Sequence, residues 1–439
     1  MDPILFWNLV TLQACANDYD SSIVSTPEHG GPARTSRAFA IIHGAMYNAM
    51  NSFSHSYEQL AQRSWASKTN PVLKRFGMSA AILEAAYQAL SFLYEKQRPI
   101  FDAVYQFHLR QIKNDTRAET EINLGLTVGR LTTSFIRENR ASDGSAAIEQ
   151  YTQLMRLGYH EADPTHPNQG FTDVHWGKVK PFYLDSASQF RSPNIVGTSP
   201  VLRGRYLKSS AYITELNEVK LLGSKTSTLR TEDQTRIGIA WGYDGAPKIG
   251  TPPRLYNQVV RVIAIKEQNT LESNARLFAL VNYAMADAAI AAWDTKYYYN
   301  FWRPIVGIRK SPNINYLDSR WTPLGAPADG VGTDFTPPFP AYVSGHATLG
   351  SATFEALRCF YNKDNISFQF QSDEYNGKTK DSNTGRFRPA LIRNYTSLTA
   401  AEKENLDSRI YLGVHWRSDV VQGQTLGRLV AREVFVKFN

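Results

Sequence analysis

Hydrophobic positions recur with a helical period along most of this chain. Four apolar residues share one face of the first clear helix: Phe39, Ile42, Met46 and Met50. Their spacing of three or four residues is typical of an amphipathic helix, and Thr35 or Ser36 would cap its start. Further helical patterns cover 78–112, 118–138 and 209–220. Because no segment shows a clear strand pattern, the chain is predicted to be all-α.

One helical pattern occurs in both halves of the chain. Segment 37–49 reads RAFAIIHGAMYNA and segment 276–288 reads RLFALVNYAMADA, with six identical positions and no gap. We interpret the match as a duplication, so that the fold would consist of two pseudo-symmetric helical bundles. A chance match between alanine-rich helices is the alternative.

Two stretches rich in proline and glycine interrupt the helical patterns. One lies within 157–235, where the periodicity is weak, and the other covers 311–340, where short hairpins could form. We therefore expect a structural N-terminal bundle over 1–156, a long connecting segment over 157–235, and a C-terminal bundle over 236–439.

Composition restricts the classes of function. The 439 residues are 42% hydrophobic and 20% charged, as in a globular protein with a substantial core. The formal net charge of +8 favours anionic partners, but the basic residues are scattered, so nucleic-acid binding is not expected. Two cysteines, Cys15 and Cys359, are too few for a disulfide framework and are expected to be free thiols.

The sequence contains no clear membrane or export signal. The longest apolar stretch, 278–293, is interrupted by Asn282 and Asp287, so we expect no membrane insertion. The N-terminus carries Asp2 and no basic residue, and it is not a convincing signal peptide. We expect a soluble protein, either cytoplasmic or secreted by a non-classical route, and the sequence leaves its location otherwise open.

The first of three short blocks in the C-terminal half reads KYYYNFWRP, from Lys296 to Pro304. Two helical turns separate Lys296 from Arg303, so both would lie on one face of a helix that Pro304 then ends. Two cations on an apolar helix require an anion or a carboxylate, and a solvated pair beside a buried aromatic stripe is the alternative. The corresponding positions of the first repeat are Tyr57 and Ser64, so the N-terminal bundle would have a structural or assembly role.

The second block, PAYVSGHA, covers 340–347 and precedes another helical pattern. Ser344 is placed to cap that helix, whose free N–H groups and positive dipole end would face an anion. Gly345 would let the anion approach the backbone, and His346 would act as an acid or base near neutral pH. An ordinary capped helix with an incidental histidine is the alternative.

The third block, SRIYLGVHWRSD, covers 408–419. Arg409 supplies a third cation, whose planar fork suits oxyanions. His415 and Asp419 are four residues apart, so they would share a helix face, and the carboxylate would fix the imidazole tautomer. The other ring nitrogen would then present a lone pair that coordinates a metal or attacks phosphorus. A core histidine with satisfied hydrogen bonds is the alternative.

Taken together, the three blocks form the pattern Lys-x6-Arg-Pro, Ser-Gly-His and Ser-Arg-x5-His-x3-Asp. This pattern resembles the signature of the vanadium haloperoxidase and type-2 phosphatidate phosphatase superfamily. Further segments look like its fungal vanadium chloroperoxidase branch: ILFWN at 4–8, GYDG at 242–245, GTPPRLYNQ at 250–258, TPLGAPA at 322–328 and PPFPAY at 337–342. The resemblance implies an all-α fold of two bundles with the active site in the C-terminal one.

The resemblance also implies vanadate as the cofactor. Five groups of this chain would hold its equatorial oxygens: Lys296, Arg303, Arg409, the Ser344 hydroxyl and the Gly345 amide. His415 would be the single protein ligand of the metal. His346 would contact the opposite apical oxygen and act as the acid–base group.

Three further positions follow from the same resemblance. Asp244, in the GYDG segment, would offset the charge of one arginine, while Trp293 and Phe339 would line the halide side of the pocket. One departure is Val343, which stands where the family usually has proline and leaves the loop backbone less constrained.

The implied activity is that of a vanadate-dependent haloperoxidase. Hydrogen peroxide would oxidise chloride, bromide or iodide to hypohalous acid, which halogenates small organic acceptors, with vanadium(V) as a Lewis acid. Halide preference, the natural substrate and a homo-oligomeric state stay open.

Two other classes of function remain as alternatives. In an acid phosphatase of the same superfamily, His415 would form a phosphohistidine and His346 would protonate the leaving group. The chain length, the repeated helix and the Trp293–Phe339 pair favour the peroxidase. A non-catalytic anion-binding or scaffold protein is the second alternative.

Overall fold

The computed structural model describes residues 2–54, 71–113, 116–328, 332–381 and 384–438. The N-terminal helices are α1 (Pro3–Asp18), α2 (Pro32–Ser54), α3 (Pro71–Leu93), α4 (Arg98–Ile112) and α5 (Glu119–Arg140). The middle of the chain forms α6 (Pro200–Tyr206), α7 (Ser210–Leu222) and α8 (Glu232–Ala240). The C-terminal helices are α9 (Pro252–Lys266), α10 (Leu271–Tyr299), α11 (Pro304–Arg309), α12 (Gly345–Tyr361), α13 (Leu398–Tyr411) and α14 (Arg417–Phe438).

Short elements complete the chain. Single 3₁₀ turns occur at Glu95–Gln97, Thr116–Ala118, Trp176–Lys178 and Asp373–Tyr375. Strand β1 (Ala326–Ala328) pairs antiparallel with β2 (Gly332–Phe335), inside the loop where a hairpin was an open alternative. A second antiparallel pair, β3 (Phe368–Phe370) with β4 (Arg393–Tyr395), lies outside the predicted loops.

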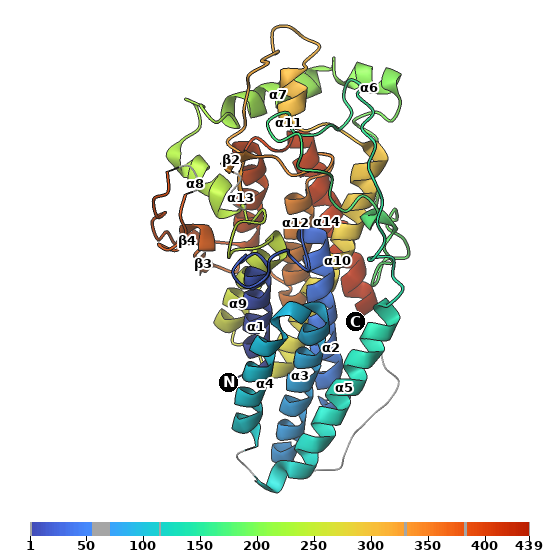
Figure 1. Ribbon diagram of the computed structural model, residues 1–439, viewed down its shortest axis with the longest axis vertical. Coiled ribbons are helices and arrows are strands. Elements are labelled where there is room, and N and C mark those ends of the chain that lie inside the picture. The colour runs from blue at the N-terminus through green and yellow to red at the C-terminus, as the bar shows by residue number, and fades with distance from the viewer. Residues whose placement is uncertain (1, 55–70, 114–115, 329–331, 382–383, 439) are drawn as a thin grey trace.

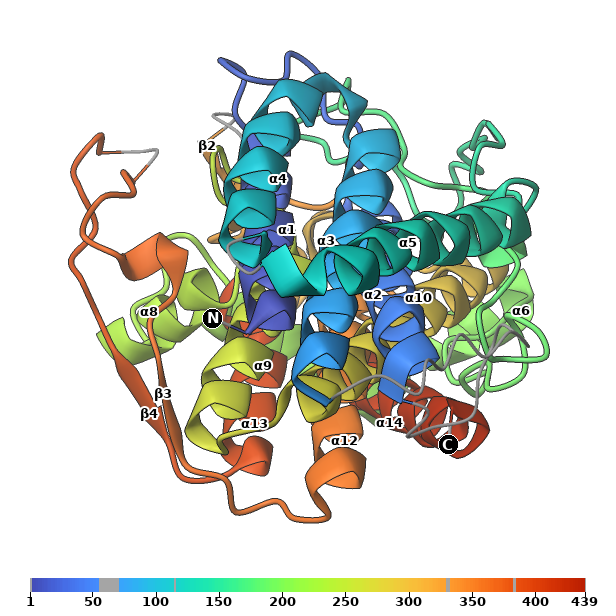
Figure 2. The same cartoon turned by 90° about the horizontal axis from the view of Figure 1, so that it is seen from below.

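Two helical bundles meet at the central helices α2 and α10 (Figure 1). In the N-terminal bundle α3 packs against α2 and α5, and in the C-terminal bundle α12 packs against α10 and α14. Seen from below, α5 crosses over α3 (Figure 2). The predicted all-α fold of two pseudo-symmetric bundles is confirmed.

The same close helix contact occurs in both bundles. Gly125 and Gly129 of α5 face α3, and a Cβ at Gly129 would lie 2.5 Å from a carbonyl oxygen of that helix. Gly423 and Gly427 of α14 face α12, and a Cβ at Gly427 would lie 2.1 Å from the Thr348 carbonyl oxygen. Pairs of glycines spaced by four residues therefore let the neighbouring helix approach in each half.

A buried network of amides and one imidazole joins the two bundles. Asn8 Nδ2 donates to His43 Nε2 at 3.1 Å and lies 3.4 Å from Asn257 Oδ1. Asn257 and Asn282 exchange two hydrogen bonds, of 2.9 and 3.0 Å. His43 and Asn282 occupy the same position of the sequence repeat, so equivalent polar residues of the two bundles belong to one network.

The connecting segment packs along α10, where it explains Asp287. This buried carboxylate accepts hydrogen bonds from the backbone N–H groups of residues 182, 183 and 184, at 2.6, 2.7 and 2.9 Å. Burial raises the pKa of Asp287, and the three N–H donors oppose that shift. An acidic residue inside an apolar helix is thus satisfied by the chain that covers it.

The expectation that no apolar stretch could span a membrane is wrong by length and composition alone. Two helical segments, Leu73–Leu93 and Leu271–Tyr299, are long and apolar enough. In their most apolar windows 67% and 94% of the residues are buried inside the protein. Both are core helices of the bundles, and the chain has the form of a soluble, globular helical protein.

One predicted helix is divided in the structure. The pattern over 78–112 forms α3 and α4, because the chain turns at 94–97 and the buried Gln97 amide donates to the Ala14 carbonyl group of α1. Pro99 then suits the first turn of α4. The patterns over 118–138 and 209–220 correspond to α5 and α7. Tyr57 and Ser64, compared above with Lys296 and Arg303, lie outside the described residues.

We expect His43 to make the protein less stable in acid. Its Nδ1–H donates to the Phe39 carbonyl oxygen and its Nε2 accepts from Asn8, so the ring is satisfied only when neutral. Burial lowers the pKa of His43 to about 4 from 6.5. The unfolded chain therefore binds this proton first, and stability falls as pH drops from 6.5 towards 4.

The measurement is the free energy of unfolding in urea at several pH values for the wild type and His43→Asn, the residue found at the equivalent position 282. In the variant, the free energy of unfolding should fall less steeply as the pH decreases, by up to about 1.4 kcal/mol per pH unit. The reason is that the variant lacks one group that takes up a proton on unfolding. Parallel slopes for the two proteins would contradict the assignment.

Candidate oxyanion-binding site

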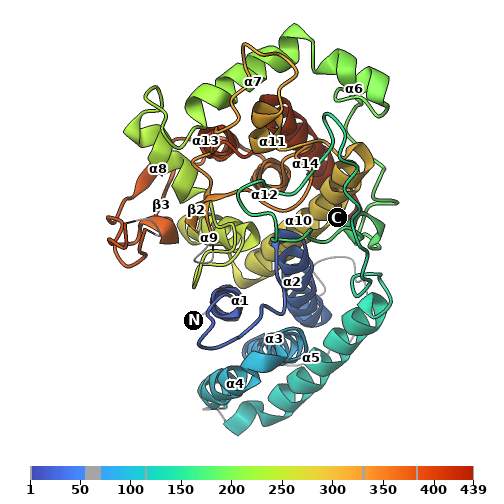
Figure 3. The same ribbon diagram turned by 45° about the horizontal axis from the view of Figure 1, so that its top comes forward.

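The residues of the three sequence blocks lie at helix ends in the C-terminal bundle, around α12 (Figure 3). These are the C-terminal ends of α10 and α13 and the N-terminal ends of α11, α12 and α14. Direct contacts link the three sequence blocks: Arg303 to His415, Arg409 to His346, and the Ser344 N–H to the Asp419 carbonyl oxygen. The structure therefore gathers the predicted residues in one buried place.

The first block is not one helix, contrary to the sequence prediction. Helix α10 ends at Tyr299, Asn300 follows with a φ of 52°, and Arg303 is the N-cap residue of α11. Pro304 begins this second helix, where its fixed φ and missing N–H are tolerated. The intervening turn still brings both cations to the Phe339 ring, with Lys296 Nζ and Arg303 Cζ each 4.8 Å from its centroid.

Backbone carbonyl groups hold Lys296 and Arg303. Lys296 Nζ donates to the carbonyl oxygens of residues 340 and 341 at 2.7 and 3.2 Å. Arg303 donates from Nε to the Phe339 carbonyl oxygen and from Nη1 to the Val414 carbonyl oxygen, both at 2.8 Å. No described carboxylate lies within ion-pairing distance of either side chain, so their charges remain uncompensated.

The second block forms the predicted helix cap. Ser344 is the N-cap residue of α12, and its Oγ accepts the Ala347 N–H at 3.3 Å. The hydroxyl proton of Ser344 and the N–H groups of Gly345 and His346 remain available to an anion, because they have no partner within the helix. Val343, at the variant position before the cap, is fully buried.

The neighbours of His346 define its tautomer. Its Nε2 lies 2.6 Å from the Gly242 carbonyl oxygen, which can only accept, so Nε2 carries the proton. Its Nδ1 lies 3.0 Å from Arg409 Nη1 and therefore presents a lone pair. Asp244 accepts from the same Arg409 nitrogen at 3.1 Å and lies 3.9 Å from Nδ1. The structure thus places Asp244 as the carboxylate that offsets Arg409.

His415 is oriented from both sides. Its Nδ1 lies 3.0 Å from Asp419 Oδ2, and its Nε2 lies 2.9 Å from Arg303 Nη1, which can only donate. Nε2 therefore carries a lone pair directed towards the cations. His415 precedes α14 rather than sharing a helix face with Asp419, whose carboxylate also accepts the Trp416 N–H at 2.9 Å.

Burial controls the protonation of the whole site. It lowers the pKa of Lys296 well below its usual range and that of Arg303 to about 9, and in both cases a neighbouring cation adds to the effect. Burial likewise lowers the pKa of His346 to about 4 and keeps His415 neutral. The charged forms of Lys296 and Arg303 are thus destabilised by their surroundings, and an anion beside them would oppose that effect.

The donor atoms fit a tetrahedral oxyanion. Nη2 of Arg303 and Nη2 of Arg409 are both buried without a hydrogen-bond partner, beside the lone pair of His415. A buried guanidinium nitrogen normally finds an acceptor, so these atoms indicate a missing anion. The described residues contain no group of three His, Cys, Asp or Glu that could bind a bare metal ion. The site suits a metal oxyanion such as vanadate, held through its oxygens.

Two clefts flank the Trp293–Phe339 pair, whose ring centroids are 4.9 Å apart. Phe339 and Asp244 line a cleft of about 460 Å³, to which the N-terminal half and the connecting segment also contribute. Trp293 lines a different cleft of about 370 Å³. The two aromatic residues therefore form a wall beside the cations, and only Phe339 faces the cleft that reaches Asp244.

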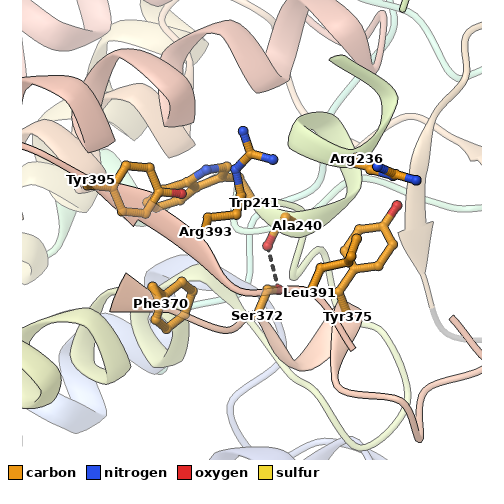
Figure 4. Close-up of a pocket in the computed structure, with 9 residues that line it drawn as sticks. All are labelled: Arg236, Ala240, Trp241, Phe370, Ser372, Tyr375, Leu391, Arg393 and Tyr395. Carbon is orange, nitrogen blue, oxygen red and sulfur yellow. Dashed lines mark hydrogen bonds between the residues drawn. The ribbon is translucent and has the colours of Figure 1, made fainter. Parts of the chain in front are cut away.

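A further pocket between α8 and strands β3 and β4 is not connected with these residues (Figure 4). Trp241, Tyr375 and Tyr395 surround it together with Arg236 and Arg393. Both arginines are already paired with carboxylates, so the pocket offers no uncompensated charge to an anion.

Sequence reasoning missed Arg203, which supports the first block from the connecting segment. Its fully buried guanidinium group donates to the carbonyl oxygens of Gly158, Gly197, Tyr299 and Asn300, at 2.5 to 3.3 Å. Two of these carbonyl groups end α10, directly before the turn that carries Arg303. The position in a segment of weak periodicity gave no signal for this role.

His160 is the second residue that sequence reasoning did not select. It is 1% exposed, and neither ring nitrogen has a hydrogen-bond partner among the described residues. Burial lowers its pKa, and the charges of Arg303 and Lys296 act in the same direction. Its backbone N–H donates to the Asn300 carbonyl oxygen, so it belongs to the same turn as Arg203.

Comparison with known proteins identifies the relatives of this chain. Residues 276–439 match the family model described as the VCPO second helical-bundle domain. The vanadium chloroperoxidase of Curvularia inaequalis is 36% identical over 305 residues, which are 60% of this chain and 49% of that protein. The chain therefore spans about half the length of this curated relative.

Solved structures show the same fold. The first bacterial vanadium-dependent iodoperoxidase superposes with a TM-score of 0.73 at 22% identity, over 100% of this chain and 96% of the other. The apo and holo forms of a bacterial vanadium-dependent chloroperoxidase give TM-scores of 0.68 and 0.69 at 14% and 16% identity. Each covers 93% of this chain, and the match includes 94% and 92% of those chains.

We expect oxyanions to stabilise the protein, because they supply the missing charge among the buried cations. Orthovanadate or phosphate at 100 times its dissociation constant would add about 2.7 kcal/mol, seen as a rise in the thermal unfolding midpoint, Tm. Arg409→Met should abolish the rise in Tm. Arg428→Met, which removes a partly exposed ion-pair partner of Glu402, should retain it. Equal rises in the two variants, or with chloride at the same ionic strength, would contradict an oxyanion site.

A second prediction concerns Arg203. Lysine cannot reproduce the fork that contacts several carbonyl groups, so Arg203→Lys should loosen the turn at 299–300 and weaken orthovanadate binding about tenfold. Titration calorimetry measures the affinity, and circular dichroism checks the fold. Arg205→Lys, an exposed position on the same helix, is the control. Unchanged affinity in Arg203→Lys would show that the clamp does not position the site.

Proposed function

We propose that the protein is a vanadate-dependent haloperoxidase, because residues 276–439 match the VCPO second helical-bundle domain and the whole chain has the fold of solved vanadium haloperoxidases. In this reaction halide, hydrogen peroxide and one proton give hypohalous acid and water. The hypohalous acid then halogenates small electron-rich organic acceptors.

One observation carries the proposal. The Nε2 lone pair of His415 lies among buried cations, and the Nη2 atoms of Arg303 and Arg409 lack acceptors beside it. Vanadate carries most of its charge on its oxygens. It therefore requires a single imidazole as ligand together with several hydrogen-bond donors to these oxygens. The 36% identity to a vanadium chloroperoxidase supports the same assignment.

The residue roles follow as part of the proposal. Five groups would hold the oxygens of vanadate: Lys296, Arg303, Arg409, the Ser344 hydroxyl and the Gly345 amide. His415 would bind the metal through Nε2, with Asp419 holding its tautomer. Bound vanadate would supply a Lewis acid that activates peroxide without a change of oxidation state.

His346 is the proposed acid–base group. Its Nε2–H is committed to the Gly242 carbonyl group, so proton transfer takes place at Nδ1. Tyr256 and Asn405 donate to the His346 carbonyl oxygen at 2.9 and 3.2 Å and fix the backbone behind it. Asp244 lies 3.9 Å from Nδ1 and favours the protonated form of His346, so it helps Nδ1 to take up a proton.

The halide and the domain roles are proposals as well. Trp293 and Phe339 would line the halide side, and chloride, bromide and iodide all remain candidates, because the relatives include chloroperoxidases and an iodoperoxidase. We assign 1–156 to structural support, 157–235 to a connection that also holds the active-site turn, and 236–439 to catalysis. A homo-oligomer is compatible with this arrangement.

A phosphatase is the second candidate function. The directed lone pair of His415 would equally attack phosphorus, and the same cations would hold a phosphate ester. His346 would then protonate the leaving group. The Trp293–Phe339 wall gives no help to such a reaction, which makes the haloperoxidase the stronger proposal.

The deciding assay follows bromination of a phenolic dye by the orthovanadate-loaded protein with peroxide and bromide, with a chromogenic phosphate ester in parallel. We expect vanadate-dependent bromination. His415→Ala should abolish it, and His346→Ala should lower kcat by 100-fold or more, the usual contribution of a general acid–base group. Lys437→Gln, at a surface ion pair, should behave as the wild type.

The assay separates the candidate functions. Robust ester hydrolysis without bromination would identify a phosphatase. A His346→Ala variant with every activity unchanged would identify a binding protein instead.

A further inference from the structure

A cleft of about 560 Å³ lies behind the segment that carries Asp244. Residues 243–245 of that segment line the cleft at Phe339, whereas residues 246–249 line this second one, so the two flank a single turn of the chain. We call it the Arg388 cleft, after its buried cation. Its charged lining residues are Lys248, Asp373, Glu374, Lys378, Lys380 and Arg388.

A buried ion pair with unused capacity lines this cleft. Arg388 is 5% exposed and its Nη1 donates to Glu374 Oε2, whose residue is fully buried. Nε and Nη2 of Arg388 and Oε1 of Glu374 have no hydrogen-bond partner among the described residues, although Nη2 lies 3.5 Å from Asp381. Buried donors of this kind are normally satisfied, so they indicate a ligand group.

Positive charge predominates around the cleft. Lys378 and Lys380 are exposed and have no ion-pair partner among the described residues. Asp373 is already held by Arg254 and Gln258, at 2.5 and 3.0 Å. Burial raises the pKa of Glu374 to about 7, and the charge of Arg388 opposes that shift.

The cleft is separated from the catalytic histidine by one residue. A Cβ built on Gly242 would lie 3.4 Å from Pro327 and 3.9 Å from Glu374 Oε1, and both of these residues line the cleft. The carbonyl oxygen of the same Gly242 accepts the His346 proton at 2.6 Å. A molecule in the cleft would therefore lie close to the site where hypohalous acid is formed.

We propose that the Arg388 cleft binds the organic acceptor, and that this acceptor is an aromatic carboxylate. Its carboxylate would meet Nε and Nη2 of Arg388, with Lys378 and Lys380 at the rim, while its ring would lie against Pro247 and Pro327. The inference rests on the proposed haloperoxidase activity. In the reaction the O–halogen bond of hypohalous acid and one ring C–H bond would break, and a C–halogen bond would form. The hydroxide left by hypohalous acid and the proton released from the ring would combine to water.

The first test is binding to the full-length, vanadate-free protein. Titration calorimetry would compare 4-hydroxybenzoate with 4-hydroxybenzamide, which has a similar shape and no charge. We expect the acid to bind at least tenfold more tightly, because it alone makes charge-assisted hydrogen bonds to Arg388. Arg388→Gln should remove this preference, and Lys437→Gln should retain it.

A second variant keeps the test decisive if Arg388→Gln does not fold. Lys378→Gln/Lys380→Gln changes only exposed side chains and should weaken binding of the acid about two- to fivefold without affecting the amide. In turnover, the same double variant should raise KM for 4-hydroxybenzoate by that factor and leave halide oxidation, measured without acceptor, unchanged.

The outcomes separate this inference from the proposed function. Equal affinity for acid and amide, or an unchanged dissociation constant in the double variant, would overturn the acceptor site. Tight binding of the acid by a protein that oxidises no halide would instead overturn the haloperoxidase assignment and leave an anion-binding cleft.

Discussion

Three cations, Lys296, Arg303 and Arg409, converge in a place that water does not reach, and the surrounding structure holds them there against their mutual repulsion. Backbone carbonyl groups from 339–341 and Val414 hold the first two, and Asp244 compensates the third. Such an arrangement costs several kcal/mol per unpaired charge unless an anion completes it. The buried, unpartnered guanidinium nitrogens mark where that anion belongs. The cations of the C-terminal bundle are therefore arranged in a way that suits an oxyanion.

The duplicated fold explains why only one bundle carries the site. Gly77 of α3 faces Gly125 as Ser344 faces Gly423 in the second bundle. Ser344 is the N-cap residue of α12, whereas α3 begins before Gly77, at Pro71. At the position where α12 begins in the second bundle, the first bundle has the interior of α3. The first bundle packs α2 against α10 and lines one side of the cleft at Phe339.

Local sequence identified the chemistry of the site but not its framework. Ser344 as a helix cap and the pairing of His415 with Asp419 could be predicted, because both depend on groups within four residues of each other. The single helix from Lys296 to Arg303 was wrong, because Arg203 and His160 bind the carbonyl groups at Tyr299 and Asn300 and hold the chain in a turn. Those partners lie more than 90 positions away, and no local pattern contains them. The same holds for Gly242, whose carbonyl group sets the His346 tautomer, and for Arg388.

The amino-acid sequence by itself determined the helical class, the duplication and the residues proposed to bind an oxyanion, since periodicity and short motifs are properties of neighbouring positions. Tertiary structure alone decided which atoms of these residues remain unpartnered, which tautomer each histidine adopts, and how far burial shifts each pKa. Those properties depend on the dielectric surroundings and on hydrogen bonds between distant segments, such as Arg303 with His415 and Arg409 with Asp244. The buried cations suit an anion because the fold removes them from water and leaves some of their hydrogen-bond donors without an acceptor.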